Sequence, residues 1–172
     1  MECIDMVAGF MTVSAMTAPK TKGQNFVQTK ILKGGVLNDV ADAMIDYGKK
    51  TGKKDFDRDA KNIAASQAVV LIGVKNADVV GLNCQACGFR DCATLNKQKK
   101  TDGEFKGPVC AFRLLDMGIA LGSAARTAAM HNVDNRIMYR VGAVVRSMGI
   151  VDWDFVMGIP LSATGKSIYF DR

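Results

Sequence analysis

The sequence is poor in several residue types that would otherwise suggest a function. Its 172 residues include one histidine, one tryptophan and three prolines. A single histidine, His131, excludes a metal site built from several histidines. No stretch reaches the ~18 uninterrupted apolar residues of a membrane span, and the first residues lack the basic and apolar regions of a signal peptide. We therefore expect a cytoplasmic protein with no membrane partner.

Charged residues are also few, at 23%, whereas 48% of the chain is hydrophobic. This composition is typical of a globular protein and excludes a disordered or fibrous one. The length predicts a single domain over 1–172. The net charge is +6, but the densest basic patch, at 49–54, is followed by three aspartates between 55 and 59 and has few aromatic residues nearby. The patch indicates a solvated helix end, so we expect no nucleic-acid partner.

Hydrophobic periodicity predicts alternating helices and strands. A small central sheet flanked by helices, in two or three layers, is the α/β (α+β) architecture that this order favours. A polar C-terminal arm follows Pro160 and has no sheet of its own to join. The predicted helices are 4–15, 36–48, 60–64, 91–97, 110–131 and 137–148, and the predicted strands are 27–31, a fully buried 68–74, and 153–159.

Four of the five cysteines lie close together in the sequence, as Cys84, Cys87, Cys92 and Cys110, with the spacing C-x2-C-x4-C-x17-C. Three thiolates within nine residues and a fourth at the start of a helix can converge on one small object, which predicts an iron-sulfur cluster. Zinc is the structural alternative, although zinc ligands usually come as two separated pairs. Uncoordinated thiols are the third. Residues 82–110, called the cysteine loop below, are predicted to be an insertion that carries this site.

Other polar and sulfur residues receive simpler interpretations. Cys3 lies far away on the first predicted helix and is expected to be a small buried hydrophobic residue. The arginines of the later helices are expected to form salt bridges or to be solvated. These are Arg113, Arg126, Arg136 and Arg140.

The cysteine-bearing stretch NCQACGFRDCATL, with GPVC after a polar gap, resembles the 4Fe-4S ferredoxin-like module of electron-transport complexes and corrinoid iron-sulfur proteins. The whole chain resembles a family of uncharacterised ferredoxin-domain-containing proteins from bacteria and archaea. The segments TAPKTKG, VVLIGVK, DMGIALGSAARTA and MGIPLSATGKSIYFDR carry that resemblance. It implies a 4Fe-4S cluster held by the four cysteines and a redox or electron-transfer role with an unknown partner protein.

The order of elements also resembles the flavin-dependent nitroreductase fold. That resemblance implies a homodimer that holds FMN at its interface. The chain departs from the pattern, because it begins without the Arg-x-Ser-x-Arg segment that grips the flavin phosphate. If FMN or a phosphate binds, the candidate residues are Lys20, Lys22 and Lys166. The alternatives to an electron-transfer protein are therefore an FMN-dependent oxidoreductase with an accessory cluster and a zinc-stabilised binding module. No catalytic residue is identified.

Overall fold

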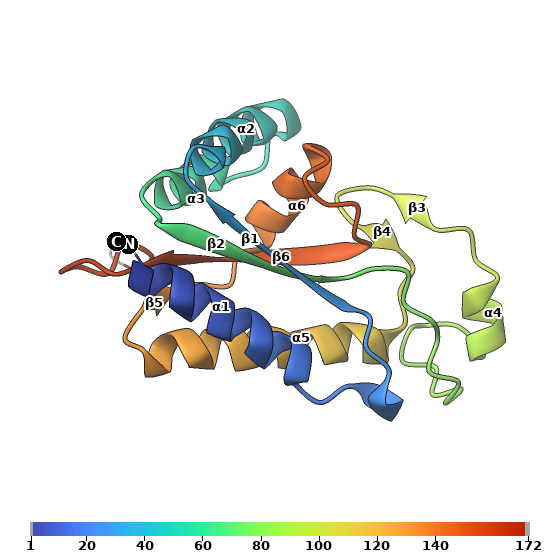
Figure 1. Cartoon of the computed structure of the whole chain (residues 1–172). Helices are drawn as coiled ribbons and strands as arrows, with labels where there is room; N and C mark the ends of the chain where they lie inside the picture. Colours follow the sequence, from blue (N-terminus) through green and yellow to red (C-terminus); the bar gives the residue numbers. More distant parts are fainter. Residues whose placement is uncertain (1, 171–172) are drawn as a thin grey trace.

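The computed structural model describes residues 2–170. A four-stranded sheet with the order β1-β2-β6-β5 lies at its centre, and all neighbouring strands are antiparallel. Helices cover both faces of this sheet (Figure 1). The prediction of a small central sheet flanked by helices is confirmed. The strands are β1 (Val27–Lys33), β2 (Ala68–Val74), β5 (Asp134–Asn135) and β6 (Phe155–Ser162).

The helices form one layer on each side of the sheet. One layer is α1 (Glu2–Thr17) and α5 (Ala111–Met130), and the other is α2 (Val36–Thr51), α3 (Phe56–Ala64) and α6 (Tyr139–Ser147). The connections contain the short elements η1 (Thr21–Gly23), α4 (Cys92–Asn96), β3 (Thr101–Asp102) and β4 (Lys106–Gly107). No helix within residues 2–170 has both the length and the apolar character needed to cross a membrane.

Strand β2 supplies the core on both faces of the sheet. All of its residues are buried. Because successive side chains of a strand point to opposite faces, Val70 and Ile72 pack in the cluster under α1 and α5, while Val69 and Leu71 pack in the cluster under α2, α3 and α6. Burial on both faces explains why this strand is a continuous apolar run.

Helix α6 lies so close to β6 that glycine is required at the contact. A Cβ atom on Gly142 would lie 1.8 Å from the carbonyl oxygen of Val156, and one on Gly158 would lie 2.5 Å from Cγ1 of Val141. The two backbones therefore touch directly, and a methyl group at either position would force them apart.

Two predicted boundaries in the C-terminal third are wrong. The helix expected from residue 137 begins at Tyr139, because Met138 forms a bridge to Gly158, with N–H···O distances of 2.8 and 3.0 Å. The last strand does not end before Pro160 but continues to Ser162. Along a strand, backbone N–H groups point alternately to the two neighbouring strands. The nitrogen of Pro160 therefore faces the β5 side of β6, as that of Gly158 does. The missing N–H of Pro160 thus leaves a gap in the hydrogen bonds on the β5 side, between β5 and the Met138 bridge. The pairing of β6 with β2 stays intact.

The C-terminal arm packs on its own chain. Tyr169 is buried, its hydroxyl lies 2.9 Å from Oγ of Ser66, and Arg136 donates a hydrogen bond of 3.0 Å to its carbonyl oxygen. Burial raises the pKa of the Tyr169 phenol. The expectation that the residues after Pro160 join no sheet is wrong for Leu161 and Ser162, which belong to β6, and is confirmed for 163–170. Arg172 lies outside the described residues.

Candidate functional site

The cysteine loop lies at one end of the molecule, beyond the ends of β2 and α5 (Figure 1, right). Its short helix α4 begins at Cys92, as predicted to within a residue. Asp91 caps this helix by accepting a hydrogen bond of 2.7 Å from the backbone N–H of Thr94. That bond holds the pKa of the Asp91 carboxyl below its ordinary value. The cap fixes where α4 starts and hence where Cys92 lies.

The four cysteines of the loop differ in exposure. Cys92 and Cys110 are buried, Cys87 is half-buried and Cys84 is exposed. The backbone N–H of Asn83 donates to Sγ of Cys92 at 3.3 Å, and the side-chain oxygen of Asn83 accepts from the N–H of Cys92 at 3.0 Å. An amide pointing at a cysteine sulfur stabilises the thiolate form, which is the form that binds metal.

An apolar cluster lies beneath the loop. Its buried members are Val80, Leu95 and Cys110, and Cys87 packs against it. Val79, Phe89 and Phe112 complete its rim. Two of the four candidate sulfur ligands therefore lie beside apolar side chains that limit the access of water.

The donor set suits an iron-sulfur cluster, since it offers four thiols, one N–H···S bond and an apolar wall. The sulfurs are not drawn together into a closed site. Across residues 2–170, no group of three or more histidine, cysteine or acidic side chains has an arrangement that could hold a metal ion. Ligation by these four cysteines stays a prediction.

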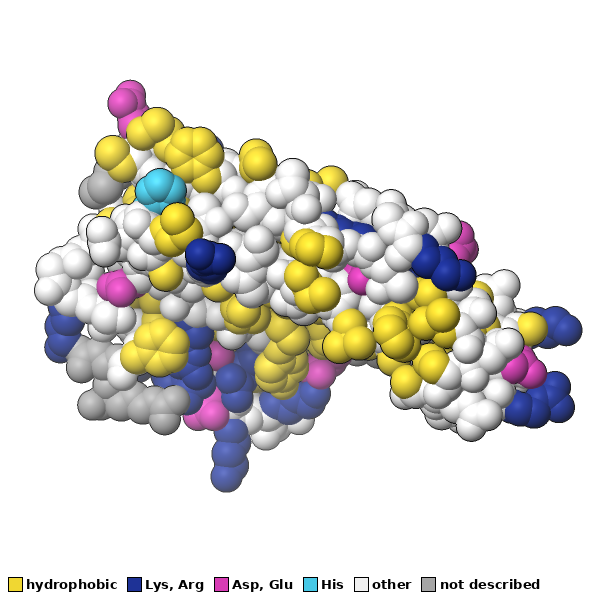
Figure 2. Space-filling model, turned by 90° about the horizontal axis from the view of Figure 1, so that it is seen from below, with side chains coloured by type: hydrophobic (Ala, Val, Ile, Leu, Met, Phe, Trp, Pro, Cys, Tyr) yellow, Lys and Arg dark blue, Asp and Glu magenta, His cyan; other side chains and the backbone are white. Residues whose placement is uncertain are grey.

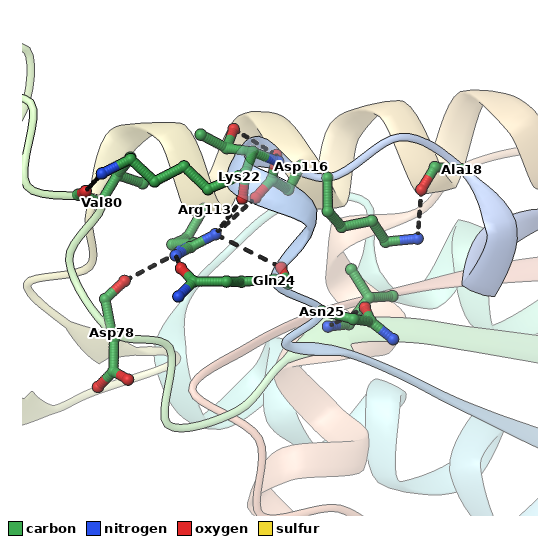
Figure 3. A network of polar contacts seen from close by, with 11 residues as sticks. Ala18, Lys22, Gln24, Asn25, Asp78, Val80, Arg113 and Asp116 are labelled. Carbon is green, nitrogen blue, oxygen red and sulfur yellow. Dashed lines mark hydrogen bonds and ion pairs between the residues drawn. The ribbon is translucent and has the colours of Figure 1, made fainter.

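A buried polar network, centred on Arg113, lies beside the loop (Figure 3). Arg113 is only 1% exposed and pairs with Asp116 at 3.2 Å, one turn further along α5. It also donates to the backbone oxygens of Thr21 and Asp78, at 3.1 and 2.9 Å, and to the side-chain oxygen of Gln24. The expected salt bridge is present, but no sequence pattern indicates that it would be buried between η1, α5 and the residues after β2.

The predicted cofactor lysines lie in two separate places. Lys20 donates to three backbone oxygens at the end of α1, at 2.6 to 2.7 Å, and burial lowers its pKa. Lys22 donates to the backbone oxygen of Val80 at 2.8 Å. Lys166 follows β6, at the end of the sheet where β2 begins, whereas η1 precedes β1 at the other end. The structure therefore groups Lys20 with Lys22 and leaves Lys166 apart from them.

Comparison with known proteins identifies the family. Residues 106–172 match a family described as uncharacterized proteins containing a ferredoxin domain. An uncharacterized protein of Archaeoglobus fulgidus is 47% identical over 171 residues, which cover 99% of this chain and 92% of that protein. The chain belongs to this ferredoxin-domain family. The matched segment includes Cys110 and none of the other three cysteines of the loop.

Solved structures show which fold this ferredoxin-domain protein adopts. An FMN-dependent nitroreductase from Mycobacterium smegmatis, in complex with NADPH, aligns with a TM-score of 0.59 at 11% identity, over 98% of this chain and 82% of that one. A nitroreductase with bound FMN from Desulfitobacterium hafniense aligns with a TM-score of 0.58 at 13% identity, over 94% and 79%. The nitroreductase-like fold is therefore confirmed, while identities this low carry no information on cofactor or activity.

The position of Cys3 completes the comparison with the sequence-based predictions. Cys3 is exposed on α1, so the prediction of a buried residue is wrong. In the first turn of α1, Ile4 points toward the sheet, and its neighbour Cys3 points away from it.

Proposed function

We propose that this ferredoxin-domain protein is a cytoplasmic iron-sulfur protein that transfers electrons. A 4Fe-4S cluster bound by Cys84, Cys87, Cys92 and Cys110 would accept and donate one electron at a time. The observation that carries the proposal is the shared environment of these thiols: all four lie in the cysteine loop, a backbone amide donates to one sulfur, and an apolar cluster lies beside two others. In this proposal the loop is an insertion within a single domain over 1–172.

The chain's own residues have defined roles in this proposal. Asn83 would stabilise negative charge on the Cys92 sulfur through its backbone N–H. The side chains of Val80 and Leu95, together with the Cβ of Cys110, would exclude water from one side of the site. Exposed Cys84 marks the side from which a redox partner could approach.

Anaerobic purification followed by iron, sulfide, zinc and flavin analysis of one sample tests this proposal. We expect about four irons and four sulfides per chain, and a loss of most of the iron when any of the four cysteines is replaced by serine. Cys3→Ser is the matched control, because Cys3 is also a free thiol but lies on α1. Unchanged iron content in two or more of the four loop variants would overturn the assignment, and zinc without sulfide would favour a zinc-stabilised module.

An FMN-dependent oxidoreductase with an accessory cluster is the second candidate, favoured by the fold alone. Several structures with this fold are FMN proteins. In this chain Lys20 and Lys22 already donate to backbone oxygens, so a phosphate would have to compete with those contacts. Lys166, within Gly165-Lys166-Ser167, would have to act from a second protomer or a separate site. Flavin in the purified sample would support this candidate.

We further propose that the protein is a homodimer formed through the outer surface of α1 and α5. Large apolar side chains on this surface are 42–69% exposed, namely Met6, Phe10, Val13, Met16, Leu115, Ile119 and Met130. Figure 2 views this side and shows hydrophobic side chains along it with few charged ones. A surface of a globular protein with many exposed apolar side chains and few charged ones is typical of an interface. A second copy offers the same surface, so two copies can bury it symmetrically.

A further inference from the structure

The residues that lead into the cysteine loop are bound by two cationic side chains from elsewhere in the fold. Lys22, on η1, donates to the backbone oxygen of Val80 at 2.8 Å. Arg113, on the first turn of α5, donates through Nε to the backbone oxygen of Asp78 at 2.9 Å. Val80 lies four residues before Cys84, and Arg113 lies three residues after Cys110 (Figure 3). The entrance and the end of the loop are thus joined through side chains.

The Arg113 contacts are rigid because the guanidinium is buried and its partners are fixed. Asp116 pairs with Arg113 and also accepts from the backbone N–H and the hydroxyl of Thr21, at 2.8 and 2.7 Å. The ring of Phe26 lies 4.7 Å from the guanidinium carbon. A buried cation must keep its hydrogen-bond acceptors in place, because an unpaired charge there would be strongly unfavourable. Asp116 therefore fixes η1, and with it Lys22, to the start of α5.

We infer that Lys22 and Arg113 are positioning residues for the cysteine ligands. By holding the backbone of 78–80 near the start of α5, they keep Val80 in the apolar cluster that also contains Cys110. The start of the cysteine loop then lies near Cys110, the candidate ligand at its end. Cys84 and Cys87 therefore start within reach of Cys110, instead of depending on a flexible connection. This inference rests on the proposed cluster, and the contacts that carry it are hydrogen bonds to backbone oxygens of 78–80.

Lys22→Met tests the inference without removing a buried charge. Lys30→Met is the matched control, because Lys30 is likewise exposed and donates to a single backbone oxygen, that of Ile150, at 2.9 Å. After anaerobic reconstitution with iron and sulfide, we expect iron to leave Lys22→Met for a chelator about tenfold faster than wild type, the effect of losing one charge-assisted hydrogen bond. Lys22→Arg, which restores a cationic donor, should recover most of the retention, and Lys30→Met should match wild type.

Amide hydrogen exchange of the full chain without iron gives a readout that does not depend on the cluster. We expect faster exchange at residues 79–90 in Lys22→Met and unchanged exchange there in Lys30→Met. A wild-type chain that binds no cluster would overturn the proposed function, whereas faster exchange at 79–90 in Lys22→Met than in wild type would still support the contact of Lys22 with this segment. Iron release and exchange both equal to wild type in Lys22→Met would overturn the inference. Faster exchange with unchanged iron release would overturn the positioning role.

Discussion

Gly142 shows how one missing side chain sets the distance between a helix and the sheet. Its hydrogen points at the backbone of Val156, where a Cβ atom would lie 1.8 Å from the carbonyl oxygen. We expect Gly142→Ala to lower the free energy of unfolding by about 3 kcal/mol, at the upper end of overpacking costs, because backbone rather than a flexible side chain must move. Urea unfolding followed by circular dichroism measures the change.

Gly122 is the matched control for this prediction, since it is also a helical glycine. Apart from its chain neighbours and the backbone of its own helix, no heavy atom of the chain lies within 4 Å of the Cβ that alanine would add there. Gly122→Ala should therefore raise the free energy of unfolding by up to about 1 kcal/mol through helix propensity. Equal effects of the two substitutions would show that α6 does not pack on β6 as closely as described.

At the scale of single residues, the sequence indicated the chemistry of the site but not its contacts. The cysteine spacing is a local pattern, so the candidate ligands could be named from it. Lys22 and Arg113 could not be recognised as partners of 78–80, because these contacts join residues 35 to 58 positions apart. Lys20 was a candidate for phosphate binding, yet it closes the end of α1. Nothing in a lysine's sequence context distinguishes these roles.

The start of helix α4 depends on one titratable group, the carboxyl of Asp91. Because Thr94 donates to Asp91, the folded pKa of Asp91 lies below its ordinary value. The cap therefore contributes its full stabilisation above the ordinary pKa of ~3.9 and loses it as the pH falls through the lower folded value. We expect the amide resonance of Thr94 to titrate with a midpoint below ~3.9 in NMR spectra.

Substitution of Asp91 separates the hydrogen bond from the charge. Asp91→Asn keeps an oxygen acceptor, so it should retain α4 and abolish this titration, whereas Asp91→Ala should fray the helix and loosen Cys92. If the amide resonance of Thr94 still shifted with pH in Asp91→Asn, the shift would have to come from another carboxylate.

At the scale of elements, local patterns predicted most helices and strands, and the exceptions lie where pairing decides. The start of the short helix at Asp91 was recognisable in the sequence. Met138 has the spacing of a helical residue, yet its pairing with Gly158 draws it into the sheet. A proline normally ends a strand, but the nitrogen of Pro160 faces the β5 side of β6, so its missing N–H does not disturb the pairing with β2. Neither outcome follows from sequence without knowledge of the neighbouring strand.

The arrangement of the whole molecule places two unlike surfaces on one chain. The cysteine loop projects at one end of the sheet, while the outer surface of α1 and α5 runs along its length (Figures 1 and 2). From Met6 to Thr17, helix α1 contains no charged residue, and from Met117 to Met130, helix α5 contains only Arg126. Burial of the outer surface of α1 and α5 in a dimer would leave the cysteine loop accessible to a redox partner. Dimer formation and electron transfer would then not compete for the same surface.

A charge placed in the middle of that surface tests the dimer. Ile119 is 48% exposed on α5, and in a symmetric interface both copies would bury it. We expect wild type to show twice the 18.5 kDa chain mass in light scattering and Ile119→Asp to show the mass of one chain at micromolar concentration, because two unpaired carboxylates would be desolvated. Met148→Asp is the control, since Met148 is 38% exposed but follows α6 in the opposite helix layer. A dimer that survives Ile119→Asp and dissociates in Met148→Asp would move the interface to the α2, α3 and α6 side, and a wild-type monomer would remove the dimer altogether.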